Sequence, residues 1–183
     1  VPELTLRGAV FQTVKHRLIF DQSLEPTTVA GFNQAFQDFN GTRSTAYGLG
    51  ADWQPLPWLW LGGEASWRDL EQPLSHDPGQ PGAFFEMFDG SEGSVRGYIG
   101  GTLGPQVAAG IGAQYLMLEQ GDTDGGNAEL ETLLVPASLR WFHPSGAFAA
   151  AEAVYYNQDL TERSTGGVES ADTQGVVINL AAG

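Results

Sequence analysis

The sequence contains no cysteine, few basic residues and no long apolar run. The lack of cysteine excludes disulfide bonds, thiolate metal ligands and a cysteine nucleophile. Only 8 Lys and Arg residues stand against 22 Asp and Glu residues, and the net charge is −14. This balance argues against nucleic-acid binding, which needs a basic surface. The sequence has no stretch of about 18 consecutive apolar residues, so no transmembrane helix is expected, and no signal peptide is recognisable.

The residues that are abundant point to an all-β protein. Charged residues make up 16% of the chain, below the usual value of about 25%. Aromatic residues reach 11%, and there are 25 glycines. Disordered chains have few aromatics and many charges, so this composition favours a folded β domain with many turns. The length of 183 residues is sufficient for one domain.

Short turns and long loops alternate between eight predicted strands. The strands are expected at approximately 3–20, 44–54, 58–70, 94–104, 107–119, 130–142, 147–160 and 175–182. Tight turns rich in Pro and Gly alternate with long loops near 21–43, 71–93, 120–129 and 161–174. Short turns on one side and long loops on the other are typical of outer-membrane barrels. We therefore predict an antiparallel up-and-down transmembrane β-barrel of about eight strands, as a single domain over 1–183.

The stretch "PWLWLGGEASWRDL" (57–70) shows the alternation of faces most clearly. Leu61 and Trp67 share one face of the expected strand, whereas Glu64 and Arg68 share the other, because successive side chains in a strand point to opposite faces. About ten residues of this pattern cross a bilayer as a tilted strand. Since the chain begins without methionine, we also expect that it is a processed chain or part of a larger barrel.

Six of the eight basic residues fall on the polar phase of these strands. A charge on the lipid face costs roughly 2–4 kcal/mol at the bilayer midplane, so this agreement is informative. Most acidic residues crowd the long-loop side and predict an acidic outer rim. We expect two carboxylates of the polar phase to pair with the cations. The predicted lumen-lining residues are Arg7, Lys15, Arg17, Glu64, Arg68, Arg96, Arg140 and Glu152.

Aromatic residues cluster near the strand ends, as in the two aromatic girdles of a barrel wall. The predicted membrane-interface residues are Trp53, Trp58, Trp67, Tyr115, Trp141 and Tyr155. Glycines on the polar phase either serve curvature or leave room inside for a plug or a neighbouring segment. They are Gly48, Gly50, Gly62, Gly100, Gly110 and Gly112.

No motif predicts catalysis, a cofactor or a metal site. The three histidines, His16, His76 and His143, lie in different segments. The acidic stretch "GDTDGGNAELE" (121–131) departs from the calcium-loop pattern and is interpreted as a solvated loop. We expect no enzymatic activity.

Residues 17–73 resemble a known family, through "SLEPTTVAGFNQAFQDFNGTRS" and "WRDLEQP". They are similar to the β-barrel region of bacterial outer-membrane proteins that carry tetratricopeptide repeats before the barrel, often described as TonB-dependent-receptor-like or porin-like. The resemblance implies a Gram-negative outer-membrane barrel with a role in transport or export and no named substrate. The chain departs from the full pattern, since it has no helical repeats, no recognisable plug and no terminal aromatic residue.

The predicted function is a transport or export channel for a polar or anionic solute in the bacterial outer membrane. The expected partners are membrane lipids, lipopolysaccharide and further barrel strands or a plug. Three alternatives stay open. A filled eight-stranded barrel would be an anchor or scaffold, because its interior has no pore. A hydrolase at the barrel rim would use acids such as Asp122 and Asp124. A soluble β-barrel binder would turn its apolar phase inward.

Overall fold

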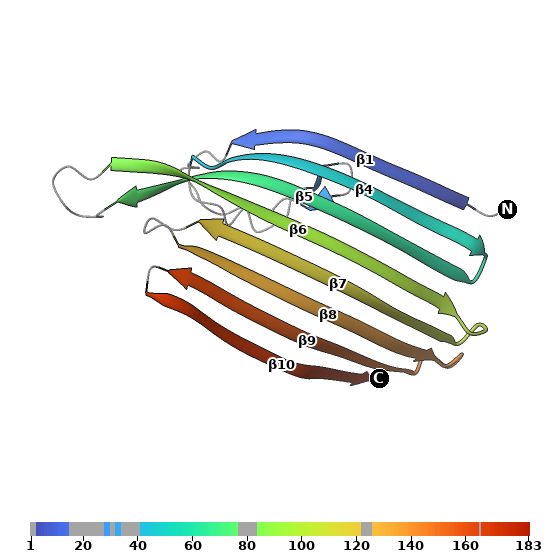
Figure 1. Ribbon diagram of the computed structural model, residues 1–183. Helices are drawn as coiled ribbons and strands as arrows, with labels where there is room; N and C mark the ends of the chain where they lie inside the picture. Colours follow the sequence, from blue (N-terminus) through green and yellow to red (C-terminus); the bar gives the residue numbers. More distant parts are fainter. Residues whose placement is uncertain are drawn as a thin grey trace.

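The protein is built from antiparallel strands, and each long strand pairs with the next long strand in the sequence (Figure 1). The computed structural model describes residues 3–14, 28–29, 32–33, 41–76, 84–121, 126–164 and 166–183. The strands are β1 (Glu3–Val14), β2 (Thr28–Val29), β3 (Phe32–Asn33), β4 (Arg43–Leu56), β5 (Leu59–His76), β6 (Phe84–Thr102), β7 (Val107–Gly121), β8 (Asn127–Phe142), β9 (Phe148–Ser164) and β10 (Gly167–Ala182).

Eight of these strands form one open sheet in the order β1-β4-β5-β6-β7-β8-β9-β10. The prediction of an all-β chain with eight antiparallel up-and-down strands is confirmed. The sheet is not closed, because β1 and β10 are edge strands with no strand partner among the described residues. They lie on opposite sides of the sheet in Figure 1. The short strands β2 and β3 pair with each other and form a separate two-stranded sheet.

The strands on the long-loop side continue beyond the predicted ends. β5 extends to His76, β6 begins at Phe84, and the β9–β10 hairpin is paired up to Ser164 and Gly167. Much of the loops predicted near 71–93 and 161–174 is therefore strand, and those predictions were wrong in extent. At the end of β5 the alternation disappears, since Glu71 and Gln72 are both polar, while the backbone ladder continues. Residues 15–20 of the first predicted strand lie outside the described residues.

Glycine with a positive φ closes two of the short turns. Gly104 (φ 77°) follows β6, and Gly146 (φ 96°) precedes β9. Both lie in the left-handed region, which is costly for residues with a Cβ atom. The amide of Gly146 also donates a 2.9 Å hydrogen bond to the carbonyl oxygen of His143, which fixes the β8–β9 turn. The β4–β5, β6–β7 and β8–β9 connections lie together at one end of the sheet.

The sheet has almost no hydrophobic core. The accessible surface of the chain is 12463 Å², whereas a compact protein of 19.5 kDa would expose about 8,500 Å². Among the described residues, only Phe32, Ala46 and Leu70 are buried hydrophobic side chains. The described residues include no helix long and apolar enough to span a membrane. The eight long strands therefore form a single layer, and most of their described side chains are at least partly accessible on both faces.

Candidate functional site

The strand register divides the side chains into a polar face and an apolar face. Residues directly opposite each other on paired strands point to the same face. Arg7, Gly50, Glu64, Arg96 and Gln114 face one another in turn across β1, β4, β5, β6 and β7 and define the polar face. The neighbours of these residues along each strand define the apolar face. The same register extends both faces through β8, β9 and β10.

An ionic network crosses four strands on the polar face. Arg7 Nη2 lies 3.1 Å from Asp52 Oδ2 and 3.4 Å from Glu64 Oε2. Glu64 also accepts from Arg96, with 2.8 Å between Oε1 and Nε. The Tyr98 hydroxyl donates a 2.6 Å hydrogen bond to Asp52 Oδ1. Glu64 is the centre of the network, and its side chain is 13% exposed.

Two glycines of the polar face leave the space that this network occupies. A Cβ atom on Gly62 would lie 2.7 Å from Asp52 Oδ1 and 2.7 Å from the Tyr98 hydroxyl. A Cβ atom on Gly50 would lie 3.2 Å from Arg7 Nη2. Any side chain at Gly62 would therefore displace the Tyr98–Asp52 contact. For these two positions, room for other side chains explains the glycine on the polar phase.

The other arginines of the polar face also have carboxylate partners. Arg68 pairs with Glu92, and Arg140 Nη2 lies 2.7 Å from Glu152 Oε1. Within the described strands, each arginine of this face thus forms an ion pair. The described carboxylates of the face outnumber its four arginines and are Glu3, Asp52, Glu64, Glu92, Glu152, Glu162 and Glu169.

The polar face contains six of the eight residues predicted from the sequence to line a lumen. They are Arg7, Glu64, Arg68, Arg96, Arg140 and Glu152. Lys15 and Arg17 lie outside the described residues. Sequence reasoning expected Glu64 and Glu152 to pair with cations, and both do. It did not identify Asp52, Glu92 and Tyr98 as partners, because pairing across strands depends on the register.

The apolar face is strongly exposed. Leu6 is 73% exposed, Leu49 72% and Leu180 78%. These side chains come from β1, β4 and β10, so the exposed band extends from one edge of the sheet to the other. Soluble monomers rarely expose one contiguous apolar surface of this extent.

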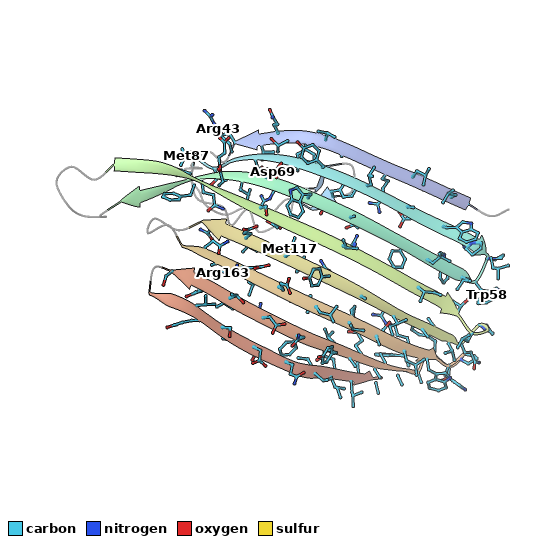
Figure 2. The ribbon with its side chains drawn as sticks, viewed as in Figure 1. Arg43, Trp58, Asp69, Met87, Met117 and Arg163 are labelled. Carbon is cyan, nitrogen blue, oxygen red and sulfur yellow. The ribbon has the colours of Figure 1, made fainter. Side chains whose placement is uncertain are left out.

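Five of the six aromatic residues predicted at the interfaces lie on the apolar face. They are Trp53, Trp67, Tyr115, Trp141 and Tyr155. Trp58 lies instead in the turn between β4 and β5. Figure 2 shows Trp58 at the short-turn end of the sheet and Arg43, Asp69 and Arg163 near the opposite end.

Trp67, Tyr115 and Tyr155 form a line near the long loops, the loop-side line. Trp67 on β5 lies in the same cross-strand row as Met117 on β7 and Asp159 on β9. Tyr115 is two residues closer to the short turns than Met117, and Tyr155 is four residues closer than Asp159. The line therefore moves toward the short turns by one residue for each strand.

Trp53 and Trp141 form a second line near the short turns, the turn-side line. Trp53 on β4 lies in the same row as Ala137 on β8, four strands away. Trp141 is four residues closer to the short turns than Ala137. This line moves by one residue for each strand in the same direction, so the two lines are parallel to each other and oblique to the hydrogen-bond rows.

The slope of the two lines gives the tilt of the strands. A shift of one residue, about 3.3 Å, for each strand spacing of about 4.8 Å corresponds to a tilt of about 35°. Strands of membrane barrels tilt by about 35–45°. On β8 the turn-side line passes through Trp141, and the loop-side line, extended by one strand from Tyr115 on β7, crosses seven residues away. For strands tilted by about 35°, seven residues span about 19 Å along the membrane normal. The aromatic rings add to this height. The apolar band of membrane barrels is typically about 25 Å tall.

The polar tips of the loop-side line have partners on the long-loop side. Trp67 Nε1 donates a 2.8 Å hydrogen bond to Asp69 Oδ1, two residues closer to the loops. The Tyr155 hydroxyl donates a 3.3 Å hydrogen bond to Gln174 Oε1. The Trp67 ring covers Gly93, where a Cβ atom would lie 2.9 Å from it. Such aromatic rings, apolar on one side and wet at the tip, are typical of membrane interfaces.

The described residues offer no assembled catalytic or metal centre. No group of three or more His, Asp or Glu side chains able to hold a metal ion occurs among them. His143 contacts Ser145, with 2.7 Å between Nδ1 and Oγ, and lies in a short turn. Asp122 and Asp124, the acids suggested for a rim hydrolase, lie outside the described residues. Comparisons with protein-family models, with curated proteins and with solved structures gave no match.

We predict that Glu64→Gln destabilises the protein by about 1–3 kcal/mol, because it removes the carboxylate shared by Arg7 and Arg96. The control Glu152→Gln removes a more exposed ion pair and costs below about 1 kcal/mol. Urea unfolding in detergent micelles, followed by tryptophan fluorescence, measures both. Equal effects of the two substitutions would show that the network adds nothing beyond an exposed pair.

Proposed function

We propose that the eight-stranded sheet is part of the wall of a β-barrel in the bacterial outer membrane, with the apolar face against lipid. The two parallel aromatic lines carry this proposal. They border one apolar band, one line through β5, β7 and β9 and the other through β4 and β8, and their slope gives the strand tilt that barrel closure requires. Aromatic residues of a soluble core have no reason to follow such oblique lines.

We propose that the polar face lines a water-filled lumen that conducts small polar solutes. Its paired charged side chains range from 13% exposed at Glu64 to 54% at Arg140, as suits contact with water. The sequence left polar and anionic solutes open. The paired arginines and the excess of carboxylates favour neutral solutes and cations over anions, since acidic linings select cations.

The open edges favour a barrel with more than eight strands. β1 and β10 lie at opposite edges of the sheet and run antiparallel to each other. Each offers unpaired backbone groups that cannot face hydrocarbon, so each needs a strand partner within a membrane. We propose that further strands complete the wall. Direct pairing of β1 with β10 would instead give a filled barrel and support the anchor or scaffold alternative.

Membrane insertion predicts opposite effects of arginine on the two faces. Ala137 and Ser138 are neighbours on β8, midway between the two aromatic lines, and point to the apolar and polar faces. Ala137→Arg should weaken folding into lipid vesicles by about 2–4 kcal/mol. Ser138→Arg, opposite Glu152, should be tolerated. Urea titrations in vesicles measure both. A larger loss for Ser138→Arg would reverse the assignment of the faces and favour a soluble barrel.

Barrel size predicts which strands can be crosslinked. The chain has no cysteine, so introduced pairs report single contacts. In a larger barrel, a cysteine at Gly8 should form no intramolecular disulfide with cysteines placed in turn along β10. The control pair Asp159→Cys and Asp172→Cys, which face each other on β9 and β10, should oxidise readily. A disulfide between β1 and β10 would establish an eight-stranded barrel.

Conduction predicts ion currents in planar bilayers. The purified protein should produce stepwise single-channel currents. In a KCl gradient the reversal potential should have the sign that indicates cation selectivity, because carboxylates outnumber arginines on the polar face. Preparations with Ala137→Arg, of which a smaller fraction should insert, serve as the control and should give fewer current steps. Stable insertion without current would contradict conduction and favour the scaffold.

A further inference from the structure

Two phenylalanine side chains of the polar face are exposed at the short-turn end of the sheet. Phe142 on β8 and Phe148 on β9 face each other in the row next to the β8–β9 turn, and they are 50% and 40% exposed. The Phe148 ring lies over Gly183, where a Cβ atom would be 2.7 Å from it. Both aromatic lines lie on the opposite face, so contact with lipid does not account for these two rings.

The two rings border a pocket of about 340 Å³ on the polar face of β8, β9 and β10. These strands lie next to one another at one edge of the sheet (Figure 1). Ala150 and Ala181 face each other on β9 and β10 and leave the space in the middle of the pocket open. Arg140, Glu152 and Asn179 line the pocket on the side away from the turn. Pockets for small ligands have volumes of about 300–1,000 Å³, so this one suits a small molecule.

The polar groups of the pocket have no net charge and offer both donors and acceptors. Arg140 Nη2 lies 2.7 Å from Glu152 Oε1, so the two charges balance. A guanidinium has several N–H donors and a carboxylate has two acceptor oxygens, so this contact leaves most of them available. Asn179 lies directly opposite Glu152, and its amide forms no hydrogen bond with another described side chain. Hydroxyl groups, which donate and accept, therefore find both kinds of partner here.

We infer that this pocket binds a neutral saccharide and that saccharides are the solutes of the conduit. The second part of the inference rests on the proposed function. A sugar ring has hydroxyl groups around its edge and C–H groups on its faces, so it fits hydrogen-bonding groups beside exposed apolar rings. The pocket places Arg140, Glu152 and Asn179 beside Phe142 and Phe148. An apolar ligand would cover these polar groups without replacing their hydrogen bonds to water, and an ion would find no unpaired opposite charge.

The first experiment measures sugar binding without conduction. The protein, folded in a detergent that carries no sugar group, should bind glucose and maltose in saturation-transfer NMR titrations. It should bind glucose more tightly than glucuronate or glucosamine, because each of these carries a net charge. Tighter binding of either charged sugar, or no binding of glucose and maltose, would overturn the inference.

Substitutions locate the bound sugar. Phe148→Ala should raise the Kd of maltose about tenfold, because it removes one of the two apolar rings. Ala150→Leu keeps both rings, fills the pocket and should also weaken binding. The matched control Phe88→Ala removes a phenylalanine of the polar face near the long loops and should leave the Kd unchanged. Urea unfolding shows that each variant is folded. Maltose binding that neither pocket variant weakens would contradict the location of the site.

The second experiment connects the site to the conduit. In planar bilayers maltose should interrupt the single-channel current, and Phe148→Ala should shift this block to about tenfold higher concentration. Binding and conduction without block would overturn saccharides as the solutes. Conduction without sugar binding would overturn the inference and leave the proposed function intact. Sugar binding that depends on Phe148 in a protein that never conducts would overturn the conduit and retain the saccharide site.

Discussion

The backbone register of the single sheet is the constraint on which the rest of the structure depends. Each paired strand satisfies its amide and carbonyl groups through its neighbours, and each side chain is thereby committed to one of two faces. Apart from the contact of Phe32 with Gly48, the described residues form no second layer. Within the described residues nothing covers the apolar face, and the proposed function places hydrocarbon against it.

The ion pairs of the polar face reinforce this register. Arg7, Glu64 and Arg96 meet only when β1, β4, β5 and β6 are paired as observed. A slip of one residue would turn Glu64 toward the apolar face and separate it from both arginines. The network thus adds specificity to a sheet whose glycines and alanines provide few distinctive contacts. Its carboxylates also neutralise the charge of its arginines, so the polar face is not a cationic surface.

The division into faces was predictable because it follows from local alternation. Trp67 and Arg68 are adjacent in the sequence, and their opposite orientations follow from extended backbone alone. The strand ends were less predictable. Glu71 and Gln72 are both polar, so the alternation that marks a half-buried strand is missing, yet both residues pair with β6. In such segments backbone hydrogen bonds maintain the ladder. These bonds form with almost any side chain, so the sequence gives no sign of the strand.

The sequence by itself determined the all-β class, the eight strands and the face on which each side chain lies, because these depend on a period of two residues and on turn chemistry. Only the tertiary structure decided the partners of each charge, the oblique course of the aromatic lines, the open edges and the pocket beside Phe142 and Phe148. Arg7 and Glu64 are 57 residues apart, and their contact depends on the register of three strands. Such contacts are non-local, and no pattern within one strand encodes them.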